Sequence, residues 1–141
     1  QRMNANKRII LNSDKIVYPD LSYRIMGIFF DIHTKLGNEL QEKIYQRAIE
    51  KRLLEQKIPF IREFHLPIQD GNRFVGKYFL DFVVDNKIAI ELKTLPTLTN
   101  SNLRQLLAYL QVAKLKLGIL VNFRTRRLTY ERVINPNVSL K

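Results

Sequence analysis

The sequence predicts an α/β fold in which a mixed β-sheet is flanked by helices. Two segments with apolar residues at helical spacing come first, and three β-like segments joined by short turns follow. A further amphipathic helix then leads into a continuous apolar run, which is typical of a strand buried on both faces. A meander of three strands, a crossover helix and a buried strand together require a sheet with both parallel and antiparallel neighbours.

Two helices are expected in the first half of the chain. The first is ended by Gly37-Asn38, and Asp20 or Ser22 is expected as its N-cap. Its apolar face comprises Leu21, Ile25, Ile28, Phe29, Ile32 and Leu36. The second helix begins near Glu39 and ends before Pro59, because the residue preceding a proline is biased away from helix. Its rougher apolar stripe comprises Leu40, Ile44, Ala48 and Leu54.

The middle of the chain changes to the two-residue period of strands. A first strand over Phe60 to Ile68 stops at the turn Asp70-Gly71-Asn72. A second strand covers Phe74 to Val84 and a third covers Lys87 to Leu92, joined tightly through Asp85-Asn86. This close spacing predicts an antiparallel meander of three strands.

A helix, a buried strand and a last strand are expected after the meander. The helix runs from about Asn100 to Ala113. Its buried side comprises Leu103, Leu106, Leu107 and Leu110. The apolar run from Leu117 to Val121 predicts the buried strand, and the last strand lies near Leu128 to Val133.

The polar and basic stretch over residues 1–17 shows little periodicity. It predicts an extended N-terminal arm, in which a short strand around Arg8 to Leu11 would fit. Residues 18–141 are then expected to form a single domain, because a chain of this length buries a genuine core. Because the sequence begins at Gln1 rather than at a methionine, we expect the chain to start further upstream.

The composition excludes several kinds of active site. The 141 residues contain no cysteine and only two histidines, so thiolate zinc sites and cysteine nucleophiles are excluded and a histidine-rich zinc site is disfavoured. A metal would therefore be a hard cation held by carboxylates, for which Mg²⁺ or Mn²⁺ fits best. No apolar run approaches the roughly 20 residues that span a bilayer and no signal peptide is visible, so a soluble cytoplasmic protein is expected.

The charge favours a polyanionic partner. Lysine and arginine number 24 against 13 aspartate and glutamate, which gives a net charge of +11 and a field that attracts nucleic acid. We expect nucleic acid, DNA in preference to RNA, over an anionic membrane surface or a charge that only aids solubility. Charge by itself does not distinguish DNA from RNA.

Two carboxylates are expected to face each other on the second and third strands. If their hairpin is centred near Asn86, Asp81 lies almost directly across from Glu91, where opposed β-carbons are about 4.5–5.5 Å apart. Lys93 lies two residues beyond Glu91 and therefore shares its face. The face opposite Asp81 is expected to carry Leu80, Phe82 and Val84.

These residue types are the ones needed to hydrolyse a phosphodiester. Like charges so close destabilise a sheet, and a divalent cation that bridges Asp81 and Glu91 would compensate. Such a cation polarises a phosphate and lowers the pKa of a bound water. The ammonium group of Lys93 can orient that water, help to deprotonate it, or stabilise developing negative charge. The alternative is a solvated strand face, which the in-register hairpin and its strongly apolar flanks disfavour.

The pattern Asp81…Glu91-Leu92-Lys93 resembles the signature of the PD-(D/E)XK nuclease superfamily, with Leu80 in place of the proline that often precedes the aspartate. The expected element order is also similar to the αβββαβ, restriction-endonuclease-like core of that superfamily. More narrowly, the chain resembles the GxxExxY family of small bacterial proteins, over nearly its whole length. The stretches that match are 32–37, 42–45, 90–93, 105–110 and 117–123.

The resemblance implies further site residues on the helices. Glu42 matches the glutamate of the GxxExxY motif because Tyr45 follows at the right spacing, and it would complete the metal site; a solvated glutamate is the alternative. The glycine that opens the motif is replaced by Glu39, which adds a second carboxylate one helical turn from Glu42. His33 also occupies a matched position, where some nuclease branches place a histidine near the metal, although a structural histidine is favoured.

Other candidates would contact the substrate. Gln105 and Tyr109 are four residues apart and share a helix face distinct from the leucine stripe. In related exonuclease-like branches such a pair lines the active centre; a polar surface with a half-buried tyrosine is an equal alternative. Two basic clusters could bind backbone phosphates, although each member is more commonly a solvated charge. The first comprises Lys114, Lys116, Arg124, Arg126 and Arg127, and the second, on the second helix, comprises Arg47, Lys51 and Arg52.

We therefore expect a nuclease that uses Mg²⁺ or Mn²⁺ and acts on DNA or, less readily, on RNA. Two alternatives stay open. An inactive nucleic-acid-binding module on the same fold need not bind metal, and a basic interaction protein with an acidic protein partner would not show salt-sensitive binding to DNA. A homodimer is compatible with this function because many small nucleases pair to cut two strands, but nothing in the sequence demands it.

Overall fold

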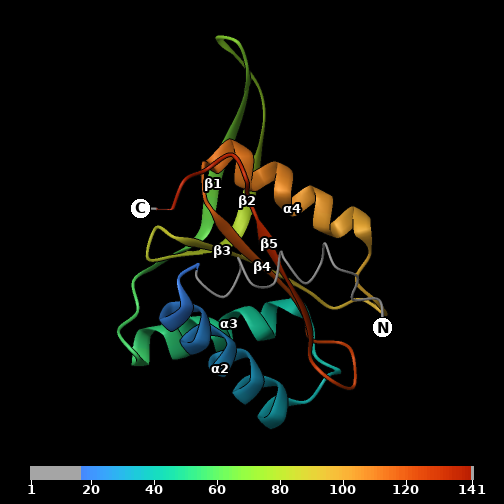
Figure 1. Ribbon diagram of the computed structural model, residues 1–141. Coiled ribbons are helices and arrows are strands. Elements are labelled where there is room, and N and C mark those ends of the chain that lie inside the picture. The colour runs from blue at the N-terminus through green and yellow to red at the C-terminus, as the bar shows by residue number, and fades with distance from the viewer. Residues whose placement is uncertain (1–16, 141) are drawn as a thin grey trace, which may run out of the picture.

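A sheet between two layers of helices organises the part of the chain that the structure, a computed structural model, describes: residues 17–140. Helices α2 (Pro19–Leu36) and α3 (Glu42–Glu55) cover one face, and α4 (Asn100–Ala113) covers the other (Figure 1). The predicted α/β class is therefore confirmed. The predicted N-terminal arm, with its short strand, lies outside the described residues except for Val17, which is buried beneath α2 and α3.

The sheet has five strands, which lie side by side in the order in which they occur in the chain. They are β1 (Phe60–Asp70), β2 (Arg73–Val84), β3 (Ile88–Lys93), β4 (Leu117–Asn122) and β5 (Thr129–Ile134). Neighbouring strands are antiparallel except β3 and β4, which are parallel and are connected through α4. The predicted meander, crossover helix and fully buried strand β4 are confirmed.

The beginning of α2 differs from the prediction. The N-cap is Tyr18, which adopts a left-handed conformation (φ 48°), and Pro19 follows at the first helical position, where its fixed φ suits a helix. Asp20 lies in the first turn, where a carboxylate interacts favourably with the helix dipole, instead of capping it. Ser22 is buried and its hydroxyl oxygen accepts a hydrogen bond from Arg132 (3.1 Å).

The buried face of α3 is also displaced from the predicted stripe. The helix begins at Glu42 instead of Glu39, and its buried residues are Tyr45, Ile49 and Leu53. Leu54, a member of the predicted stripe, is 63% exposed. The physical reason is Tyr45: its ring stacks on Phe123 (centroids 4.5 Å apart), and its hydroxyl donates to the carbonyl of Gly37 (2.6 Å) in the turn between the helices.

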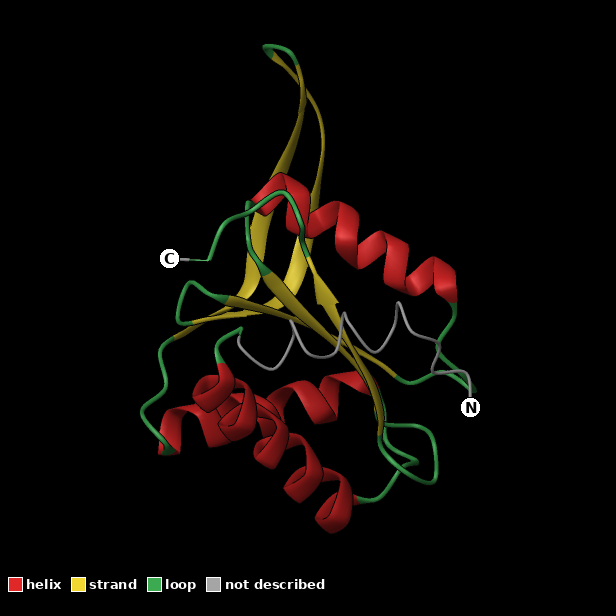
Figure 2. Ribbon diagram, in the orientation of Figure 1, coloured by secondary structure: helices red, strands yellow, loops and turns green. Residues whose placement is uncertain are grey.

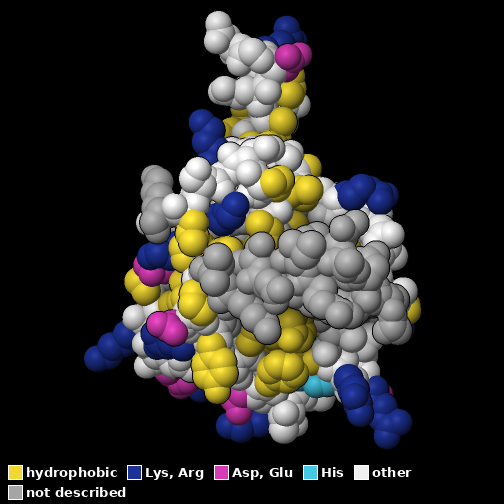
Figure 3. Space-filling model, viewed as in Figure 1, with side chains coloured by type: hydrophobic (Ala, Val, Ile, Leu, Met, Phe, Trp, Pro, Cys, Tyr) yellow, Lys and Arg dark blue, Asp and Glu magenta, His cyan; other side chains and the backbone are white. Residues whose placement is uncertain are grey.

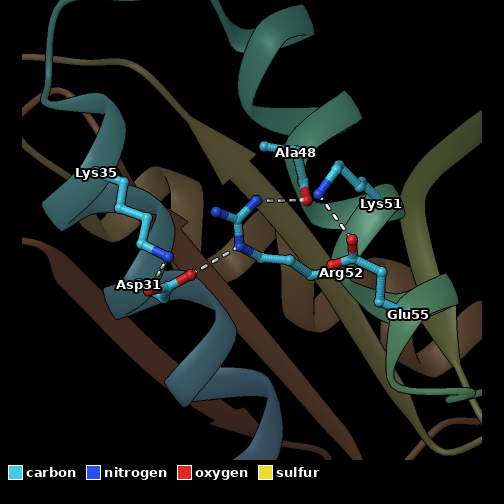
Figure 4. Close-up of polar contacts among 6 residues, drawn as sticks. All are labelled: Asp31, Lys35, Ala48, Lys51, Arg52 and Glu55. Carbon is cyan, nitrogen blue, oxygen red and sulfur yellow. Dashed lines mark hydrogen bonds and ion pairs between the residues drawn. The ribbon is translucent and has the colours of Figure 1, made fainter.

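An ion-pair network joins the two helices on their outer side (Figure 4). Arg52 of α3 donates to the carboxylate of Asp31 on α2 (3.0 Å) and to the carbonyl of Ala48 (3.3 Å). Within α3, Lys51 pairs with Glu55 at 2.7 Å. Two of the three basic residues predicted on this helix are therefore held by neighbouring acids, and Arg47 is not part of this network.

Helix α4 lies close to the sheet because Gly118 leaves room for it. Leu106 and Leu110 are the buried residues of the helix, while Leu103 and Leu107 are half-buried. A β-carbon added at Gly118 would lie 3.0 Å from Leu106 and 3.2 Å from Leu110, closer than side chains normally approach. A capping box between Thr99 and Asn102 starts the helix.

Two apolar clusters lie on opposite faces of the sheet, and β2 contributes to both. Phe82 and Val84 belong to the cluster beneath α2 and α3, whereas Leu80 belongs to the cluster beneath α4. The side chains of β2 therefore change face between Leu80 and Phe82. The expectation that Leu80 shares a face with Phe82 and Val84 is wrong.

The change of face occurs where Glu63 of β1 lies opposite Asp81 of β2, and we call this point the face reversal. Glu63 adopts a left-handed conformation (φ 54°), while β1 and β2 keep the same register before and after it. Strand β1 changes face at the same point, because Phe60 packs beneath α2 and α3 while Phe64 packs beneath α4. Side chains alternate only while every residue is extended, and one left-handed residue interrupts the alternation.

Beyond the face reversal the β1–β2 hairpin projects past α4 (Figure 2). Its surface mixes apolar and charged side chains toward the tip (Figure 3). Phe74 is 55% exposed and Phe79 is 46% exposed, with the Lys77 ammonium 5.7 Å from the centre of the Phe79 ring. None of the helices between residues 17 and 140 is long and apolar enough to cross a membrane.

Candidate functional site

Asp81 and Glu91 meet where β2 and β3 separate. The paired residues of this hairpin end at Phe82 with Ile90, and the same register places Asp81 opposite Glu91. At this point side-chain acceptors take the place of the backbone-to-backbone hydrogen bonds between the strands. The backbone N–H of Asp81 donates to Glu91 Oε2 (2.8 Å), and that of Leu92 donates to Asp81 Oδ2 (2.8 Å). The predicted juxtaposition is confirmed, and each carboxylate is held by the opposite strand.

Burial raises the pKa of both carboxyl groups. Desolvation is the main cause, and it raises the pKa of Asp81 to about 6 and that of Glu91 to about 7. The charge of Asp81 raises the pKa of Glu91 further, and the charge of Glu42 does the same to Asp81, whereas the Lys93 ammonium lowers both. The pair is therefore a concentration of negative charge that a cation would relieve.

Tyr78 holds Glu91 from the side of α4. Its O–H donates to Glu91 Oε1 (3.0 Å), and its ring stacks on Tyr109 of α4 with centroids 3.8 Å apart. Burial, together with the Glu91 charge, raises the pKa of Tyr78 above its usual range, so the hydroxyl stays a donor. The sequence pattern assigns no role to Tyr78, because strict alternation would place it on the face away from Asp81 and Glu91.

A chain of hydrogen bonds from α3 and β1 holds Asp81 on its other side. Gln46 Nε2 donates to Asp81 Oδ1 (3.2 Å), and Gln46 Oε1 accepts from Arg62 (3.3 Å). Arg62 also donates to Glu50 Oε1 (2.8 Å). Because Arg62 occupies the amide oxygen, the NH₂ group of Gln46 is turned toward Asp81. The sequence pattern singles out neither Gln46 nor Arg62, although Gln46 follows Glu42 by four residues, a spacing that places both on one helix face.

Lys93, Gln105 and Tyr109 border the same hollow as Glu91, between β3 and α4. The other residues that line it are Asn102, Leu106 and Leu120. Gln105 is exposed at its rim and Tyr109 is half-buried. The structure therefore brings this pair of α4 residues beside the carboxylates. Asn102 is an addition to the predicted set, and its side chain also caps α4.

The remaining acidic and histidine candidates have different surroundings, and they do not form one group. Glu42 is the first residue of α3, is half-buried, and is close enough to Asp81 to raise its pKa. Glu39 is exposed in the turn before α3. His33 Nε2 lies 2.9 Å from the carbonyl oxygen of Thr125, a contact that favours its structural interpretation.

The predicted basic cluster after α4 is divided between the two ends of β4. Lys114 and Lys116 precede the strand, and Lys116 donates to the carbonyl of Asn135 (3.1 Å). The other three residues follow the strand, at the end of the sheet where β3 ends in Lys93. They are Arg124, Arg126 and Arg127. The six residues of β4 span about 20 Å, so the two groups do not form one surface.

A model of the PD-(D/E)XK nuclease superfamily matches residues 19–133. The chain belongs to this superfamily. The match extends from α2 to β5 and includes every element that contributes to the carboxylate site. PD-(D/E)XK nucleases generally use divalent metals, and their substrate is nucleic acid.

The solved structures also contain a similar fold. The crystal structure of SSO0001 has 23% sequence identity and a TM-score of 0.55, over 67% of this chain and 50% of that one. This chain thus spans half the length of SSO0001, and the likeness concerns the fold. No curated protein matches the chain.

The donor atoms of the carboxylate pair fit a hard divalent cation. Each carboxylate keeps acceptor capacity beyond its two hydrogen bonds. Among residues 17–140, no group of three or more histidine, aspartate or glutamate side chains is arranged so that it could hold a metal together. Mg²⁺ does not require such a group, since it keeps several waters and binds through one or two carboxylates plus substrate phosphates.

Proposed function

We propose that this protein is a metal-dependent nuclease that hydrolyses phosphodiester bonds of DNA, and that it represents the GxxExxY branch of the superfamily. The observation that carries the proposal is the buried pair Asp81 and Glu91, which is fixed across β2 and β3 with Lys93 beside it. Two ionised carboxylates at one point destabilise a sheet unless a cation neutralises them. Superfamily membership supports nucleic acid as the substrate.

Asp81 and Glu91 are the residues that would hold Mg²⁺ or Mn²⁺. When bound, the cation would polarise a phosphate and lower the pKa of a water molecule. Tyr78 and Gln46 each bind one oxygen of a carboxylate, so both side chains are oriented before any metal arrives. This preorganisation reduces the entropic cost of forming the ligand set.

Lys93 is the residue we assign to the reacting water. Its ammonium group lies close enough to lower the pKa of both carboxyl groups, so it borders the place where the phosphate would react. There it would orient the attacking water or stabilise the developing charge. Glu42 would assist from the first turn of α3, and Gln105 and Tyr109 would position the nucleic-acid strand from α4.

The test is cleavage of labelled duplex and single-stranded DNA and RNA in Mg²⁺ or Mn²⁺, for the wild type beside Asp81→Asn and Lys93→Ala. We expect the wild type to cut DNA and both variants to lose activity by at least about 100-fold, because each removes a charge that acts in the transition state. Lys57→Ala, which removes a lysine far from the site, serves as the matched control and should cut normally.

Circular dichroism must show that the variants remain folded. Equal cleavage by the wild type and the folded Asp81→Asn variant would contradict the proposal. If the wild type binds DNA but cuts none of these substrates, the inactive-module alternative is correct. Cleavage of RNA alone would correct the substrate.

A further inference from the structure

We infer that a groove between α3 and β1 binds a backbone phosphate of the nucleic-acid strand, beside the carboxylate pair. The groove is open to solvent and has a volume of about 420 Å³. It is lined by Lys43, Gln46, Arg47, Arg62 and Glu63. Three of these five side chains are cationic and one is acidic, so the groove carries an excess of positive charge next to a site that concentrates negative charge.

Two of the cations that line the groove come from α3. Lys43 and Arg47 are four residues apart and therefore share one face of the helix. Neither side chain forms an ion pair or hydrogen bond with any residue from 17 to 140. This distinguishes them from Lys51 and Arg52 of the same helix, which are paired with acids. Unpaired cations that line a common groove are a suitable arrangement for a phosphate.

Arg62 gives the groove a fixed wall. Hydrogen bonds to Glu50 and Gln46 hold its guanidinium group, and its side chain is 23% exposed. Its Nε is buried without a hydrogen-bond partner among the described residues. A guanidinium held in one orientation loses little entropy when it binds an anion, and its planar donors suit phosphate oxygens.

The groove is directly connected to the proposed reaction site. Gln46 lines the groove and also donates to Asp81 (3.2 Å). Glu63, on the opposite wall, lies across from Asp81 at the face reversal. A strand with one phosphate at the carboxylates would therefore carry a neighbouring phosphate into the groove. The inference rests on the proposed function in one respect, namely that a substrate phosphate lies at the carboxylates and so fixes the path of the strand toward the groove.

The test measures binding in EDTA, where no cutting occurs, with a short labelled single-stranded DNA as the probe. We expect Lys43→Gln/Arg47→Gln to weaken binding by about ten-fold and to reduce the slope of log K against log salt by about one or less, because the loss of one phosphate contact on a single strand removes about 0.7 units. The control is Lys57→Gln/Lys87→Gln, which removes the same charge from two residues that do not line the groove. It should change affinity by less than about two-fold if only local contacts matter.

A methylphosphonate scan then locates the contact. Each phosphate in turn is replaced by a neutral methylphosphonate, and we expect one position to weaken the wild type but not Lys43→Gln/Arg47→Gln, as a double-mutant cycle requires for a direct contact. Equal weakening by both charge variants, or a scan that shows no such position, would overturn the inference. If Lys43→Gln/Arg47→Gln selectively weakens DNA binding but the wild type cuts nothing, the groove is supported and the nuclease proposal fails. If the wild type cuts DNA but Lys43→Gln/Arg47→Gln has no effect on binding, the nuclease proposal stands and the inference about the groove fails.

Discussion

The two faces of the sheet differ in how completely helices cover them. The face beneath α2 and α3 is closed by two helices and contains fully buried aromatic rings, among them Phe29, Tyr45, Phe82 and Phe123. The face beneath α4 has a smaller buried cluster, and partly buried residues such as Tyr78 and Tyr109 surround it. The polar site lies at the border of this second face, where the carboxylates are desolvated but still reachable. One face therefore encloses the larger apolar cluster, while incomplete closure of the other leaves the carboxylates within reach of solvent.

The largest expected effect comes from breaking the closed face. Phe82→Ala should destabilise the protein by about 3–5 kcal/mol, because the cavity is enclosed by other fully buried residues and cannot collapse. Leu110→Ala, beneath α4, should cost only about 2 kcal/mol, at the low end for leucine, because half-buried neighbours can relax into the space. Urea unfolding of both variants measures the difference. Equal losses would show that the two faces contribute alike.

An intermediate effect is expected from overfilling the α4 face. Gly118→Val should destabilise by about 1–3 kcal/mol, because its side chain would displace Leu106 and Leu110 of α4. Since Gln105 and Tyr109 lie on the same helix, the displacement should also weaken any activity. Gly76→Val, at a position where an added β-carbon meets nothing within 4 Å, is the matched control. Similar thermal melting of Gly118→Val and the wild type would refute the close approach of the helix.

The smallest effect is expected at the border between the faces, where the carboxylate pair lies. The pKa values of Asp81 and Glu91 are raised in the folded state, so the stability this pair contributes is present below about pH 4 and is lost as pH rises through about 6 to 7. Mg²⁺ binds the ionised carboxylates, and metal at about five times its Kd should therefore stabilise the protein by about 1 kcal/mol at pH 8 and by almost nothing at pH 5. Thermal melts with Mg²⁺ and with EDTA at both pH values test this. Asp81→Asn should remove the difference, and stabilisation that persists in that variant would place the metal elsewhere.

The fold and the carboxylate pair were predictable because both are encoded locally. Apolar periodicity sets each element, and a short turn at Asp85-Asn86 fixes the register that brings Asp81 opposite Glu91. The α3 stripe was not predictable in the same way. Its face is set by the stacking of Tyr45 on Phe123, residues that lie far apart in the sequence.

The surroundings of the pair depend on a feature without a sequence signal. Glu63 adopts a left-handed conformation, which is more common for glycine, asparagine or aspartate, so a glutamate at this position does not predict it. Without it, alternation places Tyr78 on the wrong face, and the contact of Tyr78 with Glu91 is missed. Gln46 and Arg62 are missed for a related reason, since their link to Asp81 requires α3 to dock beside β1.

The β1–β2 hairpin also shows where the chain can tolerate change in length. Close to Glu63 and Asp81 the hairpin still packs on a helix, because Leu66 and Tyr78 lie beneath α4, whereas beyond Ile68 and Gly76 its side-chain order is set by the turn at Gly71. Adding or removing a pair of residues between Ile68 and Gly76 would alter how far the hairpin reaches, while Tyr78 keeps its contact with Glu91. Descendants of this gene could therefore lengthen or shorten the tip of the hairpin and inherit the carboxylate pair unaltered.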